Sequence, residues 1–304
     1  MMNRFRSIRN SLKDSAKCDN AGMGKHKKIV TGTCPMCLTL DVRLQYSHFL
    51  PQAIYKSLRA PSTNANPNPV SMTRYEVKQT SSQRRAYLFC SQCEGRLSRN
   101  GENWVLRNAL KNDGTFKLRS VLERYRCQLD HSRTAAIYYA AKIPEVDISA
   151  LTYFATSMFW RGSVYPWNAS RTRPVPLGPY EEPLRRFLIG EANFPEDVML
   201  SVSVRIPSQI EKLTLSPMGE WRDLQFFGRF SMPGFAFAII AGPKIGSELR
   251  QFCFVRGEGN PLTLSEKVEQ YFLQDFKKLH DGIPVYKRTL ARPVGFNERS
   301  SDGA

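Results

Sequence analysis

The chain has 304 residues, 41% of them hydrophobic, and a formal net charge of +17 at pH 7. This length and apolar content can bury a core in one large domain or two smaller ones, and we expect two. The excess of positive charge predicts a polyanionic partner, with nucleic acid as the first candidate. The composition therefore excludes neither an enzyme nor a binding protein.

The sequence lacks the signals of secretion and of membrane insertion. Residues 1–30 are basic and poor in aliphatic side chains, so they lack the apolar segment of a secretory signal, and we interpret them as a flexible basic arm. No segment has the length of a transmembrane helix, and we find neither a basic amphipathic helix nor a lipidation signal. We therefore expect a cytoplasmic protein without a membrane partner, in which thiols stay reduced.

The first folded segment is predicted at residues 31–125. Short stretches with periodic hydrophobicity lie on either side of a long polar stretch in this segment. The polar stretch is rich in Pro, Asn, Ser and Thr, which favour turns over a packed core. In chain order we expect a strand at 38–46, a short helix at 51–58, a loop at 60–83, a strand at 86–89 and helices at 93–97 and 103–110.

The second folded segment is predicted at residues 135–284 and has the pattern of an α+β domain. We expect helices at 148–160, 180–189 and 264–279, and strands at 198–206, 223–230, 236–242 and 251–255. The four strands predict an antiparallel sheet. Trp160-Arg161 and Tyr165-Pro166-Trp167, at the end of the apolar helix, are predicted to lie in the core. We interpret residues 285–304 as a flexible tail.

Two Cys-x-x-Cys pairs, Cys34 with Cys37 and Cys90 with Cys93, predict one structural zinc ion. A gap of two residues turns the chain so that both sulfur atoms of a pair face one point. The pairs lie far apart in sequence, so the ion would close a long loop, and metal binding should be coupled to folding of this segment. The remaining cysteines have no close partner in sequence, and we interpret them as a thiol in the arm and two core residues: Cys18, Cys127 and Cys253.

The order of three motifs resembles that of the zinc-containing HNH, or ββα-metal, endonucleases. These motifs are Cys34-Pro-Met-Cys37, Ser47-His48-Phe49-Leu50-Pro51 and Leu88-Phe89-Cys90-Ser91-Gln92-Cys93-Glu94. In that family a Cys pair precedes an acidic residue, a histidine, two apolar residues and a proline, and a metal ligand follows the second Cys pair. The resemblance covers roughly residues 31–110 and implies a treble-clef, HNH-like ββα module.

The resemblance implies a catalytic role for His48 as the general base, and for Glu94 as a ligand of a catalytic Mg²⁺ or Mn²⁺ ion. Glu102 is a further candidate ligand. A neutral imidazole can accept a proton near pH 7, and carboxylates suit hard divalent cations. Ser47 stands where the family usually places an acidic or histidine ligand, and a hydroxyl is a poorer ligand. A histidine that packs beside the zinc knuckle is the structural alternative for His48.

Basic residues cluster around the second Cys pair, with Trp104 and Phe116 between them, and predict contacts with phosphates; a solvated basic face is the alternative. The candidates for nucleic-acid binding are Arg84, Arg85, Arg96, Arg99, Arg107 and Lys111.

We favour an HNH-type endonuclease, a hydrolase of phosphodiester bonds, with DNA ahead of RNA through the resemblance alone. A non-catalytic zinc module that binds nucleic acid or a protein is the alternative. An enzyme of other chemistry in the second segment comes last, because that segment offers no recognisable pair of a nucleophile and a base.

Overall fold

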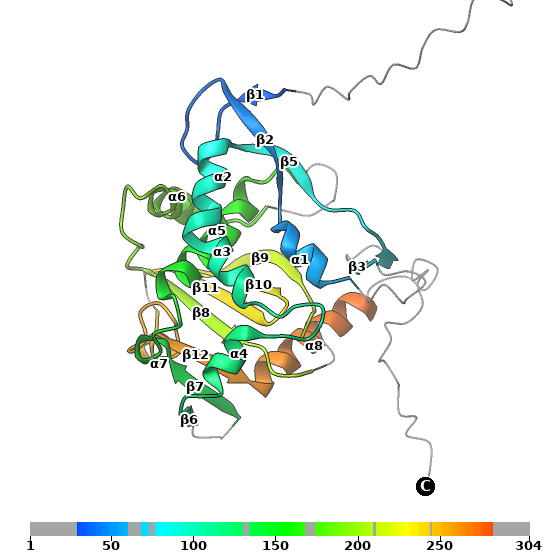
Figure 1. Cartoon of the computed structure of the whole chain (residues 1–304). Coiled ribbons are helices and arrows are strands. Elements are labelled where there is room, and N and C mark those ends of the chain that lie inside the picture. Colours follow the sequence, from blue (N-terminus) through cyan, green and yellow to red (C-terminus); the bar gives the residue numbers. More distant parts are fainter. Residues whose placement is uncertain are drawn as a thin grey trace, which may run out of the picture.

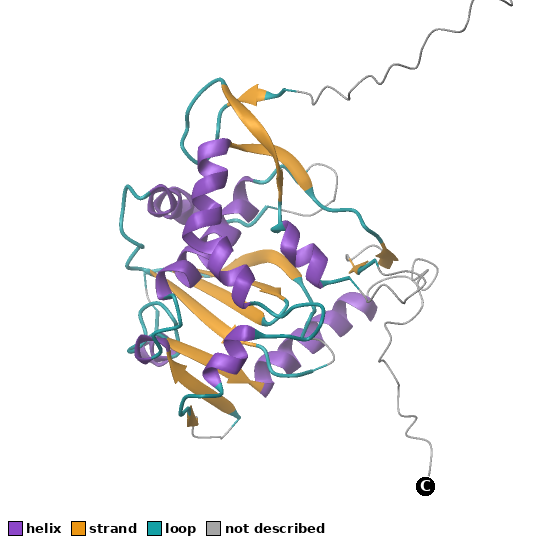
Figure 2. Ribbon diagram, in the orientation of Figure 1, coloured by secondary structure: helices purple, strands orange, loops and turns teal. Residues whose placement is uncertain are grey.

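The computed structural model describes residues 29–59, 68–72, 77–129, 134–167, 174–208, 211–243 and 245–281. The tail predicted at 285–304 and all but the last two residues of the arm lie outside these ranges. The described chain is α+β, with a small sheet at one end and a seven-stranded sheet at the other (Figure 1). Helices fill most of the space between the two sheets (Figure 2).

The small sheet has three strands in the order β1-β2-β5, and β2 is antiparallel to both neighbours. Its strands are β1 (Thr31–Gly32), β2 (Val42–His48) and β5 (Arg85–Cys90). Between β2 and β5 the chain forms α1 (Gln52–Ser57) and a hairpin of β3 (Val70–Met72) and β4 (Val77–Gln79). This hairpin lies inside the stretch predicted as loop, and residues 60–67 and 73–76 of that stretch lie outside the described ranges. The predicted strands and the predicted short helix are confirmed.

A continuous helical segment follows β5 without a break. It consists of α2 (Ser91–Leu97), a π-helical turn η1 (Ser98–Glu102) and α3 (Asn103–Asn108), and the residues at both junctions keep right-handed helical dihedral angles. The two helices predicted here are therefore confirmed, but the residues between them are helical as well. A short helix α4 (Lys117–Leu122) comes next.

The large sheet has the order β6-β7-β12-β8-β11-β10-β9, and neighbouring strands are antiparallel except β12 and β8. Its strands are β6 (Gln128–Leu129), β7 (Ala135–Tyr139), β8 (Val198–Val204), β9 (Leu215–Arg222), β10 (Gln225–Met232), β11 (Phe235–Ala241) and β12 (Pro261–Ser265). The strands predicted from 198, 223 and 236 are confirmed as β8, β10 and β11. The strand predicted at 251–255 is wrong, because α7 (Ser247–Gln251) ends there and Val255 makes only an isolated bridge.

The longest buried helix is α5 (Ile148–Val164), which begins where the Asp147 side chain accepts a hydrogen bond from the amide of Ala150 at 2.8 Å. It contacts η1, α6 (Glu181–Ile189) and the sheet strands β9 and β10. Trp160, Arg161, Tyr165, Trp167 and Cys253 are buried, as predicted. Pro166 and Cys127 are exposed, so the prediction that they lie in the core is wrong. The remaining described elements are two short 3₁₀ turns and the C-terminal helix: Ala140–Lys142, Gly178–Tyr180 and α8 (Glu266–Asp281).

Close contact between α5 and η1 depends on Gly101. A Cβ atom on Gly101 would lie 2.9 Å from the backbone nitrogen of Phe154 and 3.0 Å from its Cα atom. These are backbone atoms, so no side chain can move aside to make room. One hydrophobic cluster includes residues from both predicted folded segments, for example Phe89 and Phe154. The division of the chain into two domains stays a prediction.

Candidate functional site

The four cysteines come from one tight turn and one strand-to-helix corner at the small sheet. Cys34 and Cys37 lie in the turn before β2, where the Leu38 amide donates to the Cys34 carbonyl at 2.8 Å. Leu38 itself has a φ of 58°, which tightens this turn. Cys90 ends β5 and Cys93 lies in the first turn of α2. A strand-to-helix corner thus faces a tight turn, and each contributes one pair of cysteines.

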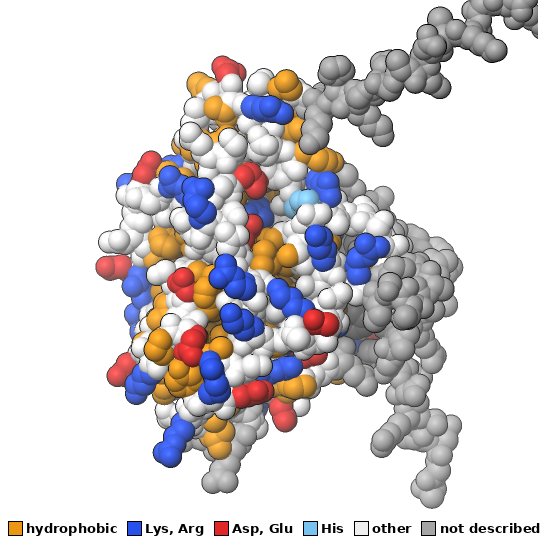
Figure 3. All heavy atoms as spheres, viewed as in Figure 1, with side chains coloured by type: hydrophobic (Ala, Val, Ile, Leu, Met, Phe, Trp, Pro, Cys, Tyr) orange, Lys and Arg blue, Asp and Glu red, His pale blue; other side chains and the backbone are white. Residues whose placement is uncertain are grey.

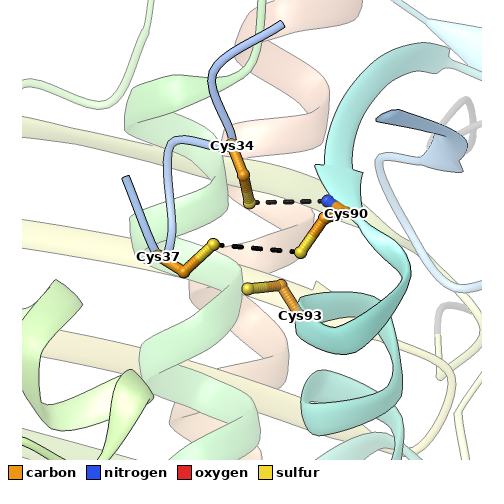
Figure 4. A group of neighbouring side chains, drawn as sticks. All are labelled: Cys34, Cys37, Cys90 and Cys93. Carbon is orange, nitrogen blue, oxygen red and sulfur yellow. Dashed lines mark hydrogen bonds between the residues drawn. The ribbon is translucent and has the colours of Figure 1, made fainter. Parts of the chain in front are cut away.

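The sulfur atoms of the four cysteines point toward one another (Figure 4) and lie within 4.8 Å of one another. The Sγ atoms of Cys37 and Cys90 are 3.8 Å apart, and the Cys90 amide donates to the Cys34 sulfur at 3.4 Å. A tetrahedron with metal–sulfur bonds of about 2.3 Å has sulfur–sulfur edges of about 3.8 Å. The cluster therefore has the size and donor set to hold a metal ion such as zinc.

The charge state of the cluster also fits a cation. The pKa of Cys34 is lowered to about 4, chiefly because the Cys93 thiol donates a hydrogen bond to its sulfur. The same contact raises the pKa of Cys93, and burial raises the pKa of Cys90. Four sulfur atoms this close can lose one proton readily, but further negative charge needs a cation among them.

The cysteine turn is held against α6 by Arg185. Its Nη1 atom donates to the carbonyl of Met36 at 2.7 Å, and Met36 is buried between the two ligand cysteines of its turn. The carboxylate of Glu182, one turn earlier on α6, accepts hydrogen bonds from Nε and Nη2 of Arg185 at 2.6 and 2.7 Å. This bidentate pair orients the guanidinium and fixes the turn independently of any metal.

His48 ends β2 and is half-buried. Its Nε2 atom lies 2.6 Å from the Oε1 atom of Gln83. Because an amide oxygen only accepts, Nε2 carries the proton of the neutral ring in this contact, and Nδ1 carries the lone pair. The pKa of His48 lies below its usual 6.5, first because burial disfavours the imidazolium and also because Arg85 and Arg161 are nearby cations; the Gln83 contact and Glu102 oppose this shift.

Ser47 and Glu94 meet on the other side of β2, since successive strand residues point to opposite faces. The Ser47 hydroxyl donates a hydrogen bond to Oε1 of Glu94, which lies in the first turn of α2. Burial raises the pKa of Glu94, although the bond from Ser47 and the cation of Arg161 act in the opposite direction. The two positions that the HNH resemblance assigns to metal ligands thus contact each other directly.

Sequence reasoning did not assign a site role to Arg161, which joins these residues from α5. Its Nη2 atom donates to Oε1 of Glu102 at 2.7 Å, and its Nη1 atom donates to the Phe49 carbonyl at 2.9 Å. The side chain is only 3% exposed. An arginine after an apolar run such as 148–160 is the one signal in the sequence, because a buried guanidinium needs an anionic or carbonyl partner. We refer to Ser47, His48, Glu94, Glu102 and Arg161 as the Arg161 cluster.

The Arg161 cluster does not fit a catalytic Mg²⁺ or Mn²⁺ ion as it stands. Among the described residues, the four cysteines form the only group of three or more His, Cys, Asp or Glu side chains whose ligand atoms lie close enough to share one ion. Glu94 accepts from Ser47, and Glu102 pairs with Arg161, so both carboxylates are already engaged. The Arg161 guanidinium supplies positive charge near both carboxylates. The arrangement of these side chains therefore supports no chemical step through a divalent cation.

Five of the six predicted phosphate-binding residues fall into two groups. Arg85, Arg99 and Arg107 are exposed. Arg96 and Lys111 instead donate to the backbone carbonyls of Ile189 and Leu106. Lys and Arg side chains are also spread widely over the face shown in Figure 3.

Arg84 differs from both groups. Its guanidinium lies over the ring of Trp167 at 5.2 Å, and its buried Nη1 atom has no hydrogen-bond partner among the described residues. Burial lowers the pKa of Arg84.

Comparison of the chain with protein-family models, with curated proteins and with solved structures gives no match in any of the three. The resemblance to HNH endonucleases therefore rests on the motif residues alone. Within the described ranges, none of the helices combines the length and hydrophobicity that crossing a lipid bilayer requires.

Proposed function

We propose that this chain hydrolyses phosphodiester bonds in nucleic acid, with DNA as the favoured substrate, and that His48 is the general base on an HNH-like treble-clef scaffold stapled by zinc. The observation that carries the proposal is the orientation, tautomer and partial exposure of the His48 ring. Gln83 orients its ring, Nδ1 keeps its lone pair, and the side chain is only half-buried. A base held neutral near pH 7 can take the proton of an attacking water molecule.

The Arg161 cluster supports a functional role for this region. Burying an ion pair such as Arg161 with Glu102 rarely stabilises a protein more than apolar side chains of the same size would. A cluster that contains two carboxylates, a guanidinium and a histidine is therefore costly for a purely structural contact. Buried titratable groups with shifted pKa values gather preferentially at functional sites.

In this proposal each residue has a distinct task. His48 Nδ1 accepts a proton from water. Arg161 holds the backbone of His48 and Phe49 through their carbonyl oxygens, which fixes the end of β2 and thus the direction of the imidazole. The exposed Arg85, opposite His48 on β5, contacts the phosphate backbone.

The test is cleavage of plasmid and single-stranded DNA by the full chain, with and without Mg²⁺ or Mn²⁺, because the HNH resemblance implies such a cation. We expect His48→Ala to lower the cleavage rate by about 10²- to 10⁴-fold while the zinc content stays the same. Cys127→Ser, a change at an exposed cysteine away from the cluster, serves as the matched control and should cut like the wild type. Equal rates for His48→Ala and the wild type would refute the proposal.

A non-catalytic zinc module that binds nucleic acid is the second candidate. The contact between Ser47 and Glu94 favours it, because these two side chains satisfy each other where the resemblance places metal ligands. This candidate predicts salt-dependent DNA binding without turnover by either the wild type or His48→Ala.

A further inference from the structure

The ribbon formed by β2 and β5 presents four side chains on one face. Tyr46 lies opposite Tyr87 in the strand register, and His48 lies opposite Arg85. Directly opposed residues share a face, and so do residues two apart on one strand. Both tyrosines, the arginine and the proposed general base therefore lie side by side, whereas Ser47 points to the opposite face toward Glu94.

The two tyrosines form an aromatic pair in which Tyr46 is exposed and Tyr87 is half-buried. Their ring centroids are 5.0 Å apart with an angle of 40° between the planes, and Tyr46 is 56% exposed. An aromatic ring of this exposure leaves much apolar surface in contact with water. Arg85 is exposed as well, and its Nη2 atom donates to Gln83 Oε1 at 2.9 Å, the same atom that contacts His48. Gln83 thus orients a cation and the imidazole together.

We infer that this face binds single-stranded nucleic acid, with bases stacked on Tyr46 and Tyr87 and a phosphate held by Arg85. The inference rests on the proposed function and names the substrate class of the same site. Aromatic side chains beside cations are the usual surface for unpaired strands, since every base has a flat π face. The bases of an intact duplex stack on one another, so their faces cannot reach the tyrosines.

The spacing on β2 agrees with this arrangement. Tyr46 and His48 are two residues apart, which separates them by about 7 Å along an extended strand. A base on Tyr46 therefore brings a neighbouring phosphate toward His48 and Arg85 rather than to a remote part of the molecule. A cross-strand pair that only stabilises the ribbon is the alternative role of the tyrosines. It gives no reason for the pair to stand beside the proposed base.

Binding is measured by fluorescence anisotropy with a labelled single-stranded DNA and with a duplex of the same sequence, at two salt concentrations. The full chain carries His48→Ala so that the probe stays intact. In this background we compare Tyr46→Ala, Tyr46→Phe and Tyr271→Ala. Tyr271 on α8 is 64% exposed and is the matched control for removal of a surface tyrosine. Zinc content and thermal unfolding are recorded for each variant.

We expect Tyr46→Ala to weaken single-strand binding by about 5- to 100-fold, which corresponds to the loss of one stacked base. Tyr46→Phe, which keeps the ring, and Tyr271→Ala should bind as the His48→Ala parent does. Duplex binding should change less than single-strand binding in Tyr46→Ala.

The outcomes separate this inference from the proposed function. Unchanged single-strand binding by Tyr46→Ala, or an equal loss for the duplex, overturns the inference and leaves the role of His48 intact. Binding that depends on Tyr46 in a protein whose wild type does not cut DNA supports the inference, with the face acting as a binding surface, and refutes hydrolysis. A Tyr46→Phe variant that folds and binds as weakly as Tyr46→Ala also overturns the inference.

Discussion

Arg161 and Phe49 are 112 residues apart in sequence, yet the guanidinium of Arg161 donates to the Phe49 carbonyl at 2.9 Å. The same side chain reaches the carboxylate of Glu102 at 2.7 Å. One residue of α5 therefore binds both the end of β2 and the end of η1. The proposed base is held in place by a helix from the second predicted segment, so a fragment limited to residues 31–125 would lack this support.

Replacing Arg161 with methionine should destabilise the protein by about 3–5 kcal/mol, because Glu102 would keep a buried charge without its partner. The double variant Arg161→Met with Glu102→Leu should recover part of that loss, since it removes both charges. The measurement is the free energy of unfolding in urea. Arg222→Met serves as the control, because the Arg222 pair with Glu220 is exposed and such pairs contribute less than about 1 kcal/mol. A double variant less stable than either single one would contradict this account.

Gly101→Ala should force α5 and η1 apart, because the new methyl group would lie 2.9 Å from a backbone nitrogen of α5. Overpacking of this kind costs about 1–3 kcal/mol of the unfolding free energy. Gly246→Ala is the matched control: a Cβ atom there meets nothing within 4 Å, and its φ of −59° suits alanine. Thermal unfolding of both variants provides the comparison, and equal melting temperatures would contradict the close helix contact.

Cys37→Ser should lower the bound zinc measured by atomic emission and destabilise the chain. The sulfur contact between Cys37 and Cys90 spans 53 residues, and a cross-link that closes such a loop restricts the unfolded chain by about 4 kcal/mol on an entropic model. Cys127→Ser should change neither quantity, since Cys127 is exposed and outside the cluster. Full zinc occupancy in Cys37→Ser would show that three thiolates are enough.

The pH dependence of cleavage should report the environment of His48. A general base works when it is deprotonated, and burial places the pKa of His48 below 6.5. The acidic limb of kcat/KM should therefore lie below pH 6.5, and activity should be lost only as the pH falls through that limb. Arg85→Gln removes a nearby cation, so the limb should move to higher pH. Zinc content is recorded at each pH, because acid also protonates the thiolates. A limb above pH 6.5 in the wild type would contradict His48 as the base.

The sequence predicts the four-cysteine cluster well because the signal of each Cys-x-x-Cys pair is local. Two Cys-x-x-Cys spacings define the ligands, and the turns that present them are short-range structures. The long apolar run at 148–160 predicts helix α5 equally well. Strand β9 was not predicted, because Pro217, Gly219 and a charged end interrupt its alternation. Its place at the sheet edge tolerates these residues, and only the tertiary fold decides that.

The Arg161 cluster could be predicted only in part. His48 and Glu94 follow from their positions in the motifs that resemble HNH endonucleases, and Glu102 was only a further candidate, but Arg161 was not predicted as their partner. Periodicity places Arg161 in the core at the end of α5 and says nothing about which carboxylate it meets. The contact between Ser47 and Glu94 is likewise a tertiary feature, since 47 residues separate them. Such pairings depend on how α5 packs against η1 and how α2 packs against β2, which no local pattern encodes.

The unbroken helical segment from Ser91 to Asn108 sets the distance between the two polar centres of the molecule. It carries Cys93 near one end and Glu102 further along, joined by a backbone that advances about 1.5 Å per residue where it is α-helical. The length of this segment thus fixes how far the cysteines lie from Arg161. Surface substitutions along it leave that length unchanged, whereas loss of a single residue between Leu97 and Glu102 would shorten it and turn the carboxylate away from its partner.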